Sequence, residues 1–166
     1  MNRCTLEWVE RMNDLHGIQP GAVLEVGSRD YNGSPRSLFA GSEYVGVDID
    51  AGNGVDLVMS AYELSEHFQR MRFGTVLLLN VLEHLGTPWV ALAEIGKVIS
   101  VGGYLYVSAP SFGYPLHDCP GDYWRVSEQT VRKVFMAGYD IISLEHAKTQ
   151  WGKYPVIHCL GVKCPT

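Results

Sequence analysis

The stretch Ala22-Val23-Leu24-Glu25-Val26-Gly27 decides the fold, because it is a short apolar run closed by a glycine. Such a run is typical of a strand that is buried on both faces of a sheet. Further strands are predicted over residues 44–49, 55–59, 75–80 and 104–109. Helical spacing separates them over residues 61–70 and 90–99. Strands that alternate with helices indicate a mostly parallel sheet covered on both faces.

Two more helices and a hairpin complete the prediction. A helical period over residues 5–15 ends near Gly17, and Ser127 is placed to cap a helix that runs through Phe135. The last two predicted strands, 140–146 and 155–162, are too close for a helix between them and should form a hairpin. We therefore predict a doubly wound α/β fold with a seven-stranded, mostly parallel sheet and one antiparallel strand.

The 166 residues fit one domain, made of an N-terminal helix (1–20), a central part (21–110) and a C-terminal loop, helix and hairpin (111–166). A net charge of -5 disfavours nucleic-acid binding. No apolar stretch suits a secretory leader or a membrane span. The four scattered cysteines favour a reducing, cytoplasmic setting, and His158, Cys159 and Cys164 lack the spacing of a zinc site.

Glycine and polar residues stand where three predicted strands end, and in open α/β sheets ligands bind outside these ends. Gly27 allows a ligand to approach the backbone, and Gly33 can relax the following turn into a helix. Glu25 suits a cationic group and would repel a pyrophosphate. Asp48, about 20 residues after the glycine loop, could accept hydrogen bonds from ribose hydroxyls, with Asp50 as the alternative.

The third feature is the segment Asn80-Val81-Leu82-Glu83-His84-Leu85, which follows the most apolar run of the chain. A polar residue there is costly to bury unpaired, so a binding role is one interpretation. The plainer interpretation is that Asn80 or His84 caps a helix or bonds a loop carbonyl. For Glu25 and Asp48, the plainer interpretation is an acidic side chain in a solvent-exposed turn.

Together, Glu25-x-Gly27, Asp48, Ser60-Ala61 and Leu82-Glu83-His84-Leu85 resemble class I S-adenosylmethionine-dependent methyltransferases, above all the small type 11 group. The resemblance runs from about residue 23 to 162. It implies that Glu25 and Gly27 hold the methionine end of the cofactor, with Ser28 and Gly33 as further cofactor-binding residues of the same loop. Asp48 would bind the ribose, Ile49, Ser60 and Ala61 would surround the adenine, and Asn80 and Val81 would lie near the methionine and sulfonium. The family's common Gly-x-Gly-x-Gly is reduced here to Gly27 and, further on, Gly33.

The loop of residues 110–125 leaves the fifth predicted strand at the same edge and is the candidate acceptor side. His117 is the first candidate for the general base and His84 the second. The candidate acceptor-binding residues are Tyr114, Asp122, Tyr123, Trp124 and Arg125. The order Pro-x-His-x-x-Pro-x-Asp-Tyr-Trp-Arg is similar to methyltransferases found with bacterial polysaccharide and glycan synthesis genes. Alternatively, Tyr123 and Trp124 pack into the core and Arg125 pairs with Asp122.

The resemblance implies methyl transfer to oxygen or nitrogen of a small polar acceptor, with a sugar or glycan precursor as the candidate. One alternative is a methyltransferase-like domain that holds cofactor or a protein partner without turnover. A nicotinamide oxidoreductase is disfavoured, because Arg29 replaces the middle glycine of its fingerprint and no Tyr-x-x-x-Lys pair is evident. Some quinone-pathway relatives bind a divalent metal beside the segment equivalent to Glu83-His84, but Asn80 stands here where a further carboxylate ligand would be needed, so no metal is expected. The acceptor and the oligomeric state, a homo-oligomer included, stay open.

Overall fold

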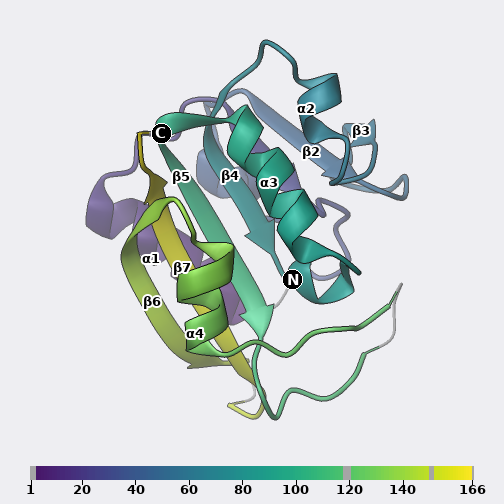
Figure 1. Cartoon of the computed structure of the whole chain (residues 1–166), viewed down its shortest axis with the longest axis vertical. Coiled ribbons are helices and arrows are strands. Elements are labelled where there is room, and N and C mark those ends of the chain that lie inside the picture. Colours follow the sequence, from purple (N-terminus) through teal and green to yellow (C-terminus); the bar gives the residue numbers. More distant parts are fainter. Residues whose placement is uncertain (1–2, 118–120, 150–151, 166) are drawn as a thin grey trace.

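The computed structural model describes residues 3–117, 121–149 and 152–165, and its strands form one seven-stranded sheet of order β3-β2-β1-β4-β5-β7-β6 (Figure 1). The strands are β1 (Val23–Val26), β2 (Tyr44–Asp48), β3 (Leu57–Val58), β4 (Phe73–Leu79), β5 (Ile99–Pro110), β6 (Tyr139–Lys148) and β7 (Pro155–Lys163). Strand β7 pairs antiparallel with both β5 and β6, while the other neighbours are parallel. The predicted fold class and the C-terminal hairpin are confirmed.

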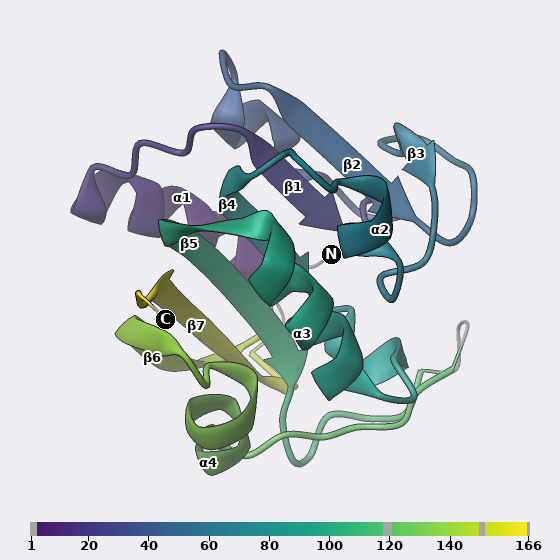
Figure 2. The ribbon, with the colours of Figure 1, turned by 45° about the horizontal axis from the view of Figure 1, so that its top comes forward.

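Helices cover both faces of the sheet (Figure 2). Helix α1 (Arg3–His16) and a short 3₁₀ helix (Pro35–Phe39) lie on one face, and α2 (Leu64–His67), α3 (Pro88–Val98) and α4 (Glu128–Thr130) lie on the other. Because side chains alternate along a strand, β1 directs Val23 to the first face and Leu24 to the second. Among the described residues, no helix has both the length and the apolar character to cross a membrane.

Two of the predicted helices differ from the structure. The helix expected over residues 61–70 is only the four-residue α2, and Ala61, Leu64 and Phe68 of this segment are buried. Glu63, at its N-cap, makes no capping hydrogen bond through its side chain, so little stabilises a longer helix. The predicted helix from Ser127 exists as α4 and continues as a π-helical turn, Val131–Phe135. The Ser127 Oγ accepts from the Thr130 backbone N–H at 3.0 Å, as its predicted capping role requires.

The crossover from β1 to β2 also differs from expectation, because no α-helix follows Gly33. Ser34 caps the short 3₁₀ helix instead, and its Oγ accepts from the Arg36 backbone N–H at 3.2 Å. Phe39 of that helix is buried with Trp8 of α1 in one apolar cluster. The N-terminal helix therefore helps to fill the face that a longer crossover helix would cover.

Candidate active site

The loops that follow β1, β2 and β4 are in direct contact at the carboxyl edge of the sheet. Gly27 has a φ of 78°, and a Cβ atom there would lie under 3.0 Å from Val81 Cγ2 in the loop after β4. A Cβ atom at Gly54, in the loop after β2, would lie 2.6 Å from the Ser28 carbonyl oxygen. Glycine at these positions is what allows the three loops to meet. Ser28 itself is buried, and its hydroxyl has no hydrogen-bond partner among the described residues.

Glu25 lies inside the fold at the end of β1. It is 2 % exposed, and the Tyr44 hydroxyl donates to its Oε2 at 2.9 Å. Burial raises the pKa of Glu25 to about 7, which the bond from Tyr44 and the charge of Arg36 offset only in part. The carboxylate is thus held in place by β2 rather than standing on the surface.

Asp48 ends β2 with both carboxylate oxygens oriented by backbone amides. Its Oδ2 accepts from the Arg29 N–H and its Oδ1 from the Asp50 N–H, each at 3.1 Å. The alternative acid, Asp50, forms an ion pair with the Arg29 side chain at 3.2 Å. Asp48 is therefore the better placed of the two, since its carboxylate is fixed at the strand end and is still half-buried.

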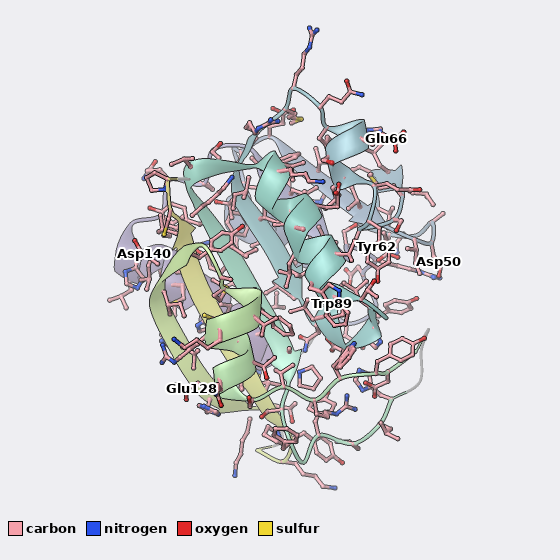
Figure 3. The ribbon with its side chains drawn as sticks, viewed as in Figure 1. Asp50, Tyr62, Glu66, Trp89, Glu128 and Asp140 are labelled. Carbon is pink, nitrogen blue, oxygen red and sulfur yellow. The ribbon has the colours of Figure 1, made fainter. Side chains whose placement is uncertain are left out.

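The predicted adenine-side residues lie beside this strand end. Ile49 is 56 % exposed, which is unusual for an aliphatic side chain next to a buried strand. Ala61 is buried, and the Ser60 Oγ accepts from the Tyr62 backbone N–H at 3.2 Å. Figure 3 shows Asp50, Tyr62 and Trp89 on the same side of the molecule. Tyr62 and Trp89 are 36 % and 52 % exposed, and the role of Ile49, Ser60 and Ala61 in binding adenine stays a prediction.

Asn80 follows β4 in a left-handed conformation. Its φ of 57° is the one positive value at a non-glycine position in the described part of the chain. The Asn80 N–H donates to the Ser108 carbonyl at 2.9 Å, and the Ser108 hydroxyl donates to Asn80 Oδ1 at 3.4 Å. Asparagine tolerates this conformation better than most residues, and such outliers cluster at functional sites. Asn80 is thus a turn residue held by β5, not a helix cap.

Glu83, His84 and His117 form a cluster where the turn after β4 meets the loop after β5. Both histidine Nε2 atoms lie 3.9 Å from Glu83 Oε1. The Glu83 side chain is 1 % exposed, against 18 % for His84 and 38 % for His117. Burial raises the pKa of Glu83 to about 8, which the Glu83 backbone and the Asn80 side chain offset only in part. The two histidines predicted as base candidates are thus neighbours, with rings 5.0 Å apart.

Asp122 and Arg125 form the ion pair that the alternative interpretation expects. The Arg125 Nη2 donates to Asp122 Oδ2 at 2.5 Å, and its other nitrogens donate to the carbonyls of Tyr114 and Trp124. The Arg125 guanidinium beside Asp122 holds the pKa of that carboxyl well below its usual range. Asp122 also accepts from the His117 backbone N–H at 2.8 Å. The pair therefore holds the loop that carries His117, and a role for either residue in binding an acceptor stays a prediction.

The three aromatic residues of this loop are placed differently. Trp124 is half-buried, and its indole N–H donates to the Leu85 carbonyl at 2.7 Å. Tyr123 is 63 % exposed, while its backbone N–H donates to the Glu83 carbonyl at 2.7 Å. Tyr114 is half-buried, with its ring 5.4 Å from the His117 ring. Trp124 thus packs inward and Tyr123 does not; residues 118–120 of the predicted pattern lie outside the described residues.

Glu83 and Tyr44 are central to the observed site, although neither was predicted as a site residue. A charged residue between Leu82 and Leu85 was the available signal for Glu83. No comparable signal existed for Tyr44, because its partnership with Glu25 depends on the register of β1 against β2.

Comparison with known proteins identifies the fold. No protein-family model matches the chain, and no curated protein matches its sequence. Among solved structures, a 1,6-didemethyltoxoflavin-N1-methyltransferase of Burkholderia thailandensis, with bound 1,6-didemethyltoxoflavin and S-adenosylhomocysteine, matches at a TM-score of 0.79 and 15 % identity, over 97 % of this chain and 79 % of that one. The N-methyltransferase NodS of Bradyrhizobium japonicum, with S-adenosylhomocysteine, matches at 0.74 and 13 %, over 97 % and 86 %.

A third match is the N-terminal domain of EvdMO1, determined in the presence of S-adenosylhomocysteine and D-fucose. Its TM-score is 0.65 at 14 % identity, over 97 % of this chain and 83 % of that one. The chain thus has the fold of class I S-adenosylmethionine-dependent methyltransferases. Identities this low establish the architecture, and function has to be argued from the site.

Proposed function

We propose that this chain transfers a methyl group from S-adenosylmethionine to an oxygen or nitrogen atom of a small polar acceptor, with a sugar or glycan precursor as the candidate class. The observation that supports this most is the meeting of Gly27, Asp48 and Asn80 at one sheet edge, in a fold that many such enzymes share. The presence of D-fucose with one structural neighbour favours the sugar class.

The residues at this edge fit the cofactor chemically. Asp48 has two oriented oxygens for vicinal hydroxyls, and the exposed Ile49 offers an apolar face to the adenine beside Ser60 and Ala61. Glu25, Gly27, Ser28 and Gly33 would hold the methionine end, and Asn80 and Val81 the sulfonium region. When bound, the cofactor supplies a methyl group on a positively charged sulfur, already activated for displacement.

His117 is the proposed general base for an acceptor hydroxyl. As the new carbon–oxygen bond forms and the carbon–sulfur bond breaks, the hydroxyl proton passes to the imidazole. Asp122 Oδ2 lies 3.1 Å from His117 Nδ1, on the other side of the ring from the Nε2 atom that would take the proton. His84 is the second candidate. The loop's task is to align the acceptor and keep water out.

One observation favours the alternative, a domain that binds cofactor without turnover. The glycine loop after β1 leads into a short 3₁₀ helix instead of an α-helix, and its turn is closed by a hydrogen bond from the Gly33 N–H to Asp30 Oδ1 at 2.6 Å. Binding and turnover therefore have to be measured separately.

The binding experiment is calorimetry with S-adenosylhomocysteine, and with NAD as the contrasting ligand. We expect micromolar affinity for the sulfur compound and none for NAD. Asp48→Asn should weaken binding by roughly 10- to 100-fold, the worth of hydrogen bonds to a charged group. Asp50→Asn, two residues further along the chain, is the matched control and should bind as the parent does. Equal effects of the two substitutions, or no binding by the parent, would overturn the proposed cofactor site.

Turnover is tested by transfer of a labelled methyl group to a panel of sugars and other polar acceptors. His117→Asn should retain binding of S-adenosylhomocysteine but lose turnover. A parent protein that binds cofactor yet labels no acceptor would favour the non-catalytic alternative.

A further inference from the structure

The Glu83, His84 and His117 cluster has the chemistry and spacing of a metal site. One ligand atom from each residue lies within 4.8 Å of the other two. The residues come from two segments, the turn after β4 and the loop after β5, so the fold rather than the sequence brings them together. Two imidazoles and one carboxylate are a donor set that Zn²⁺ and its neighbours in the transition series prefer.

Both imidazoles are oriented with their Nε2 atoms toward Glu83. The His84 Nδ1 forms a hydrogen bond with the Gly121 carbonyl, and because a carbonyl can only accept, Nδ1 carries the proton. The Nε2 of a neutral His84 is then a free lone pair. The His117 Nδ1 lies 3.1 Å from Asp122 Oδ2, although out of line for a hydrogen bond. His84 is thus held as metal-binding histidines commonly are, through a hydrogen bond of the nitrogen that does not bind the metal.

Glu83 supplies an independent observation that points to a ligand. Its side chain is 1 % exposed, yet neither oxygen has a partner with hydrogen-bond geometry among the described residues. No described lysine or arginine forms an ion pair with it. A buried carboxylate in this state is costly unless it is neutralised or coordinates a cation. The oxygen nearest the imidazoles, Oε1, is 3.9 Å from each Nε2, too far for a direct hydrogen bond.

We propose that Glu83, His84 and His117 bind one divalent transition-metal ion of the Zn²⁺ type. Tetrahedral zinc with bonds of about 2.0–2.1 Å holds its ligand atoms roughly 3.3 Å apart. The two Nε2–Oε1 separations of 3.9 Å therefore need to close by about 0.6 Å, and any separation at the 4.8 Å limit of the cluster by about 1.5 Å, through rotation of the two histidine side chains. The expectation of no metal rested on Asn80 as the missing ligand, and His117 takes that place from a different segment.

Three protein ligands leave a position open, as in catalytic zinc sites. With the ion bound, His117 Nε2 is a ligand and not the general base. The ion would then lower the pKa of an acceptor hydroxyl that it binds, which replaces the step given to His117 above. Metal binding itself does not depend on the proposed methyl transfer and can be tested without cofactor.

The test titrates the chelator-treated full chain with Co²⁺, whose visible absorption reports coordination, and with Zn²⁺ as competitor. We expect one Co²⁺ per chain, displaced by Zn²⁺, with no thiolate charge-transfer band in the near ultraviolet. Glu83→Gln and His117→Ala should each weaken binding at least tenfold, since loss of even an outer-shell partner costs 10- to 100-fold. Circular dichroism and S-adenosylhomocysteine binding check that each variant is folded.

His146→Ala is the matched control, because His146 also lies 3.0 Å from a carboxylate, that of Glu128, but is exposed. Figure 3 places Glu128 on α4, away from the turn after β4. This variant should bind Co²⁺ as the parent does. Binding that survives in both cluster variants, a thiolate band, or no stoichiometric binding by the parent would overturn the proposal. Retention of S-adenosylhomocysteine binding in that case would leave the proposed function standing.

Discussion

The contact between Gly27 and Val81 makes a sharp prediction for Gly27→Ala. At a φ of 78°, an alanine costs about 1–2 kcal/mol of backbone strain. Its Cβ would also come under 3.0 Å from Val81 Cγ2, and overpacking of this kind adds about 1–3 kcal/mol. We therefore expect Gly27→Ala to lower the free energy of unfolding by about 2–5 kcal/mol.

Two further variants separate strain from overlap. Gly138 has a similar φ of 85° with nothing within 4 Å of its added Cβ, so Gly138→Ala should cost only the strain. Val81→Ala removes the atom that is overlapped and, because Val81 is half-buried, should by itself cost about 1 kcal/mol. The double variant Gly27→Ala, Val81→Ala should then be about 1–3 kcal/mol more stable than the sum of the single effects predicts.

The assay is urea unfolding followed by tryptophan fluorescence, with the m-value checked for constancy. S-adenosylhomocysteine affinity should follow the same order, being lost in Gly27→Ala and partly restored in the double variant. Single effects that add within about 0.5 kcal/mol would refute the contact. So would a Gly138→Ala variant as unstable as Gly27→Ala.

Three other predictions concern stability. Tyr44→Phe leaves the Glu25 carboxylate without its donor and should cost about 1–3 kcal/mol in urea unfolding. Ser127→Ala removes the N-cap of α4 and should lower the free energy of unfolding by about 1 kcal/mol in the same assay. An unchanged free energy would show that the cap contributes nothing to stability. Burial lowers the pKa of His158 from 6.5 to about 4, so the unfolded chain binds more protons between these values. Stability should fall by up to about 3 kcal/mol as the pH drops through that window, and His158→Gln should lose this slope.

Much of the cofactor edge could be predicted because parallel strands end at one edge. Gly27, Asp48 and Asn80 each follow an apolar run in the sequence, and the structure brings their loops together there. The ends of strand β3 were harder to predict. A strand was expected over residues 55–59, but only Leu57–Val58 pairs with β2, and the Asp56 carboxylate instead accepts a hydrogen bond from the Gly46 N–H at 2.6 Å.

For the proposed acceptor side, the sequence predicted which residue types the loop supplies but not which of them would be in contact. Arg125 and Asp122 are three positions apart, so their pairing was an open alternative in the sequence. The approach of His117 to Glu83 was not readable, because it depends on where the long loop after β5 returns across the sheet edge. That path is set by backbone bonds such as Tyr123 N–H to the Glu83 carbonyl, which have no signature in side-chain type.

The turn after β4 connects the two halves of the site. Asn80 adopts its left-handed conformation at a cost of order 1–3 kcal/mol, and the hydrogen bonds to Ser108 hold it there. That conformation sets the course of the next residues, so that Val81 meets Gly27 on the proposed cofactor side and Glu83 meets His117 on the proposed acceptor side.

A single strained turn therefore fixes the distance between the two sides, which a methyl transfer needs to be short and constant. Ser108 extends the same support inward, since its hydroxyl lies 3.5 Å from Thr5 of α1, and Thr5 lies 3.1 Å from the buried His158. This chain of polar side chains runs through a mostly apolar core, where it is stable only if its members satisfy one another. The docking of α1 is thereby tied to the conformation of Asn80, and a change at Thr5 should reach the cofactor site although it touches neither proposed ligand.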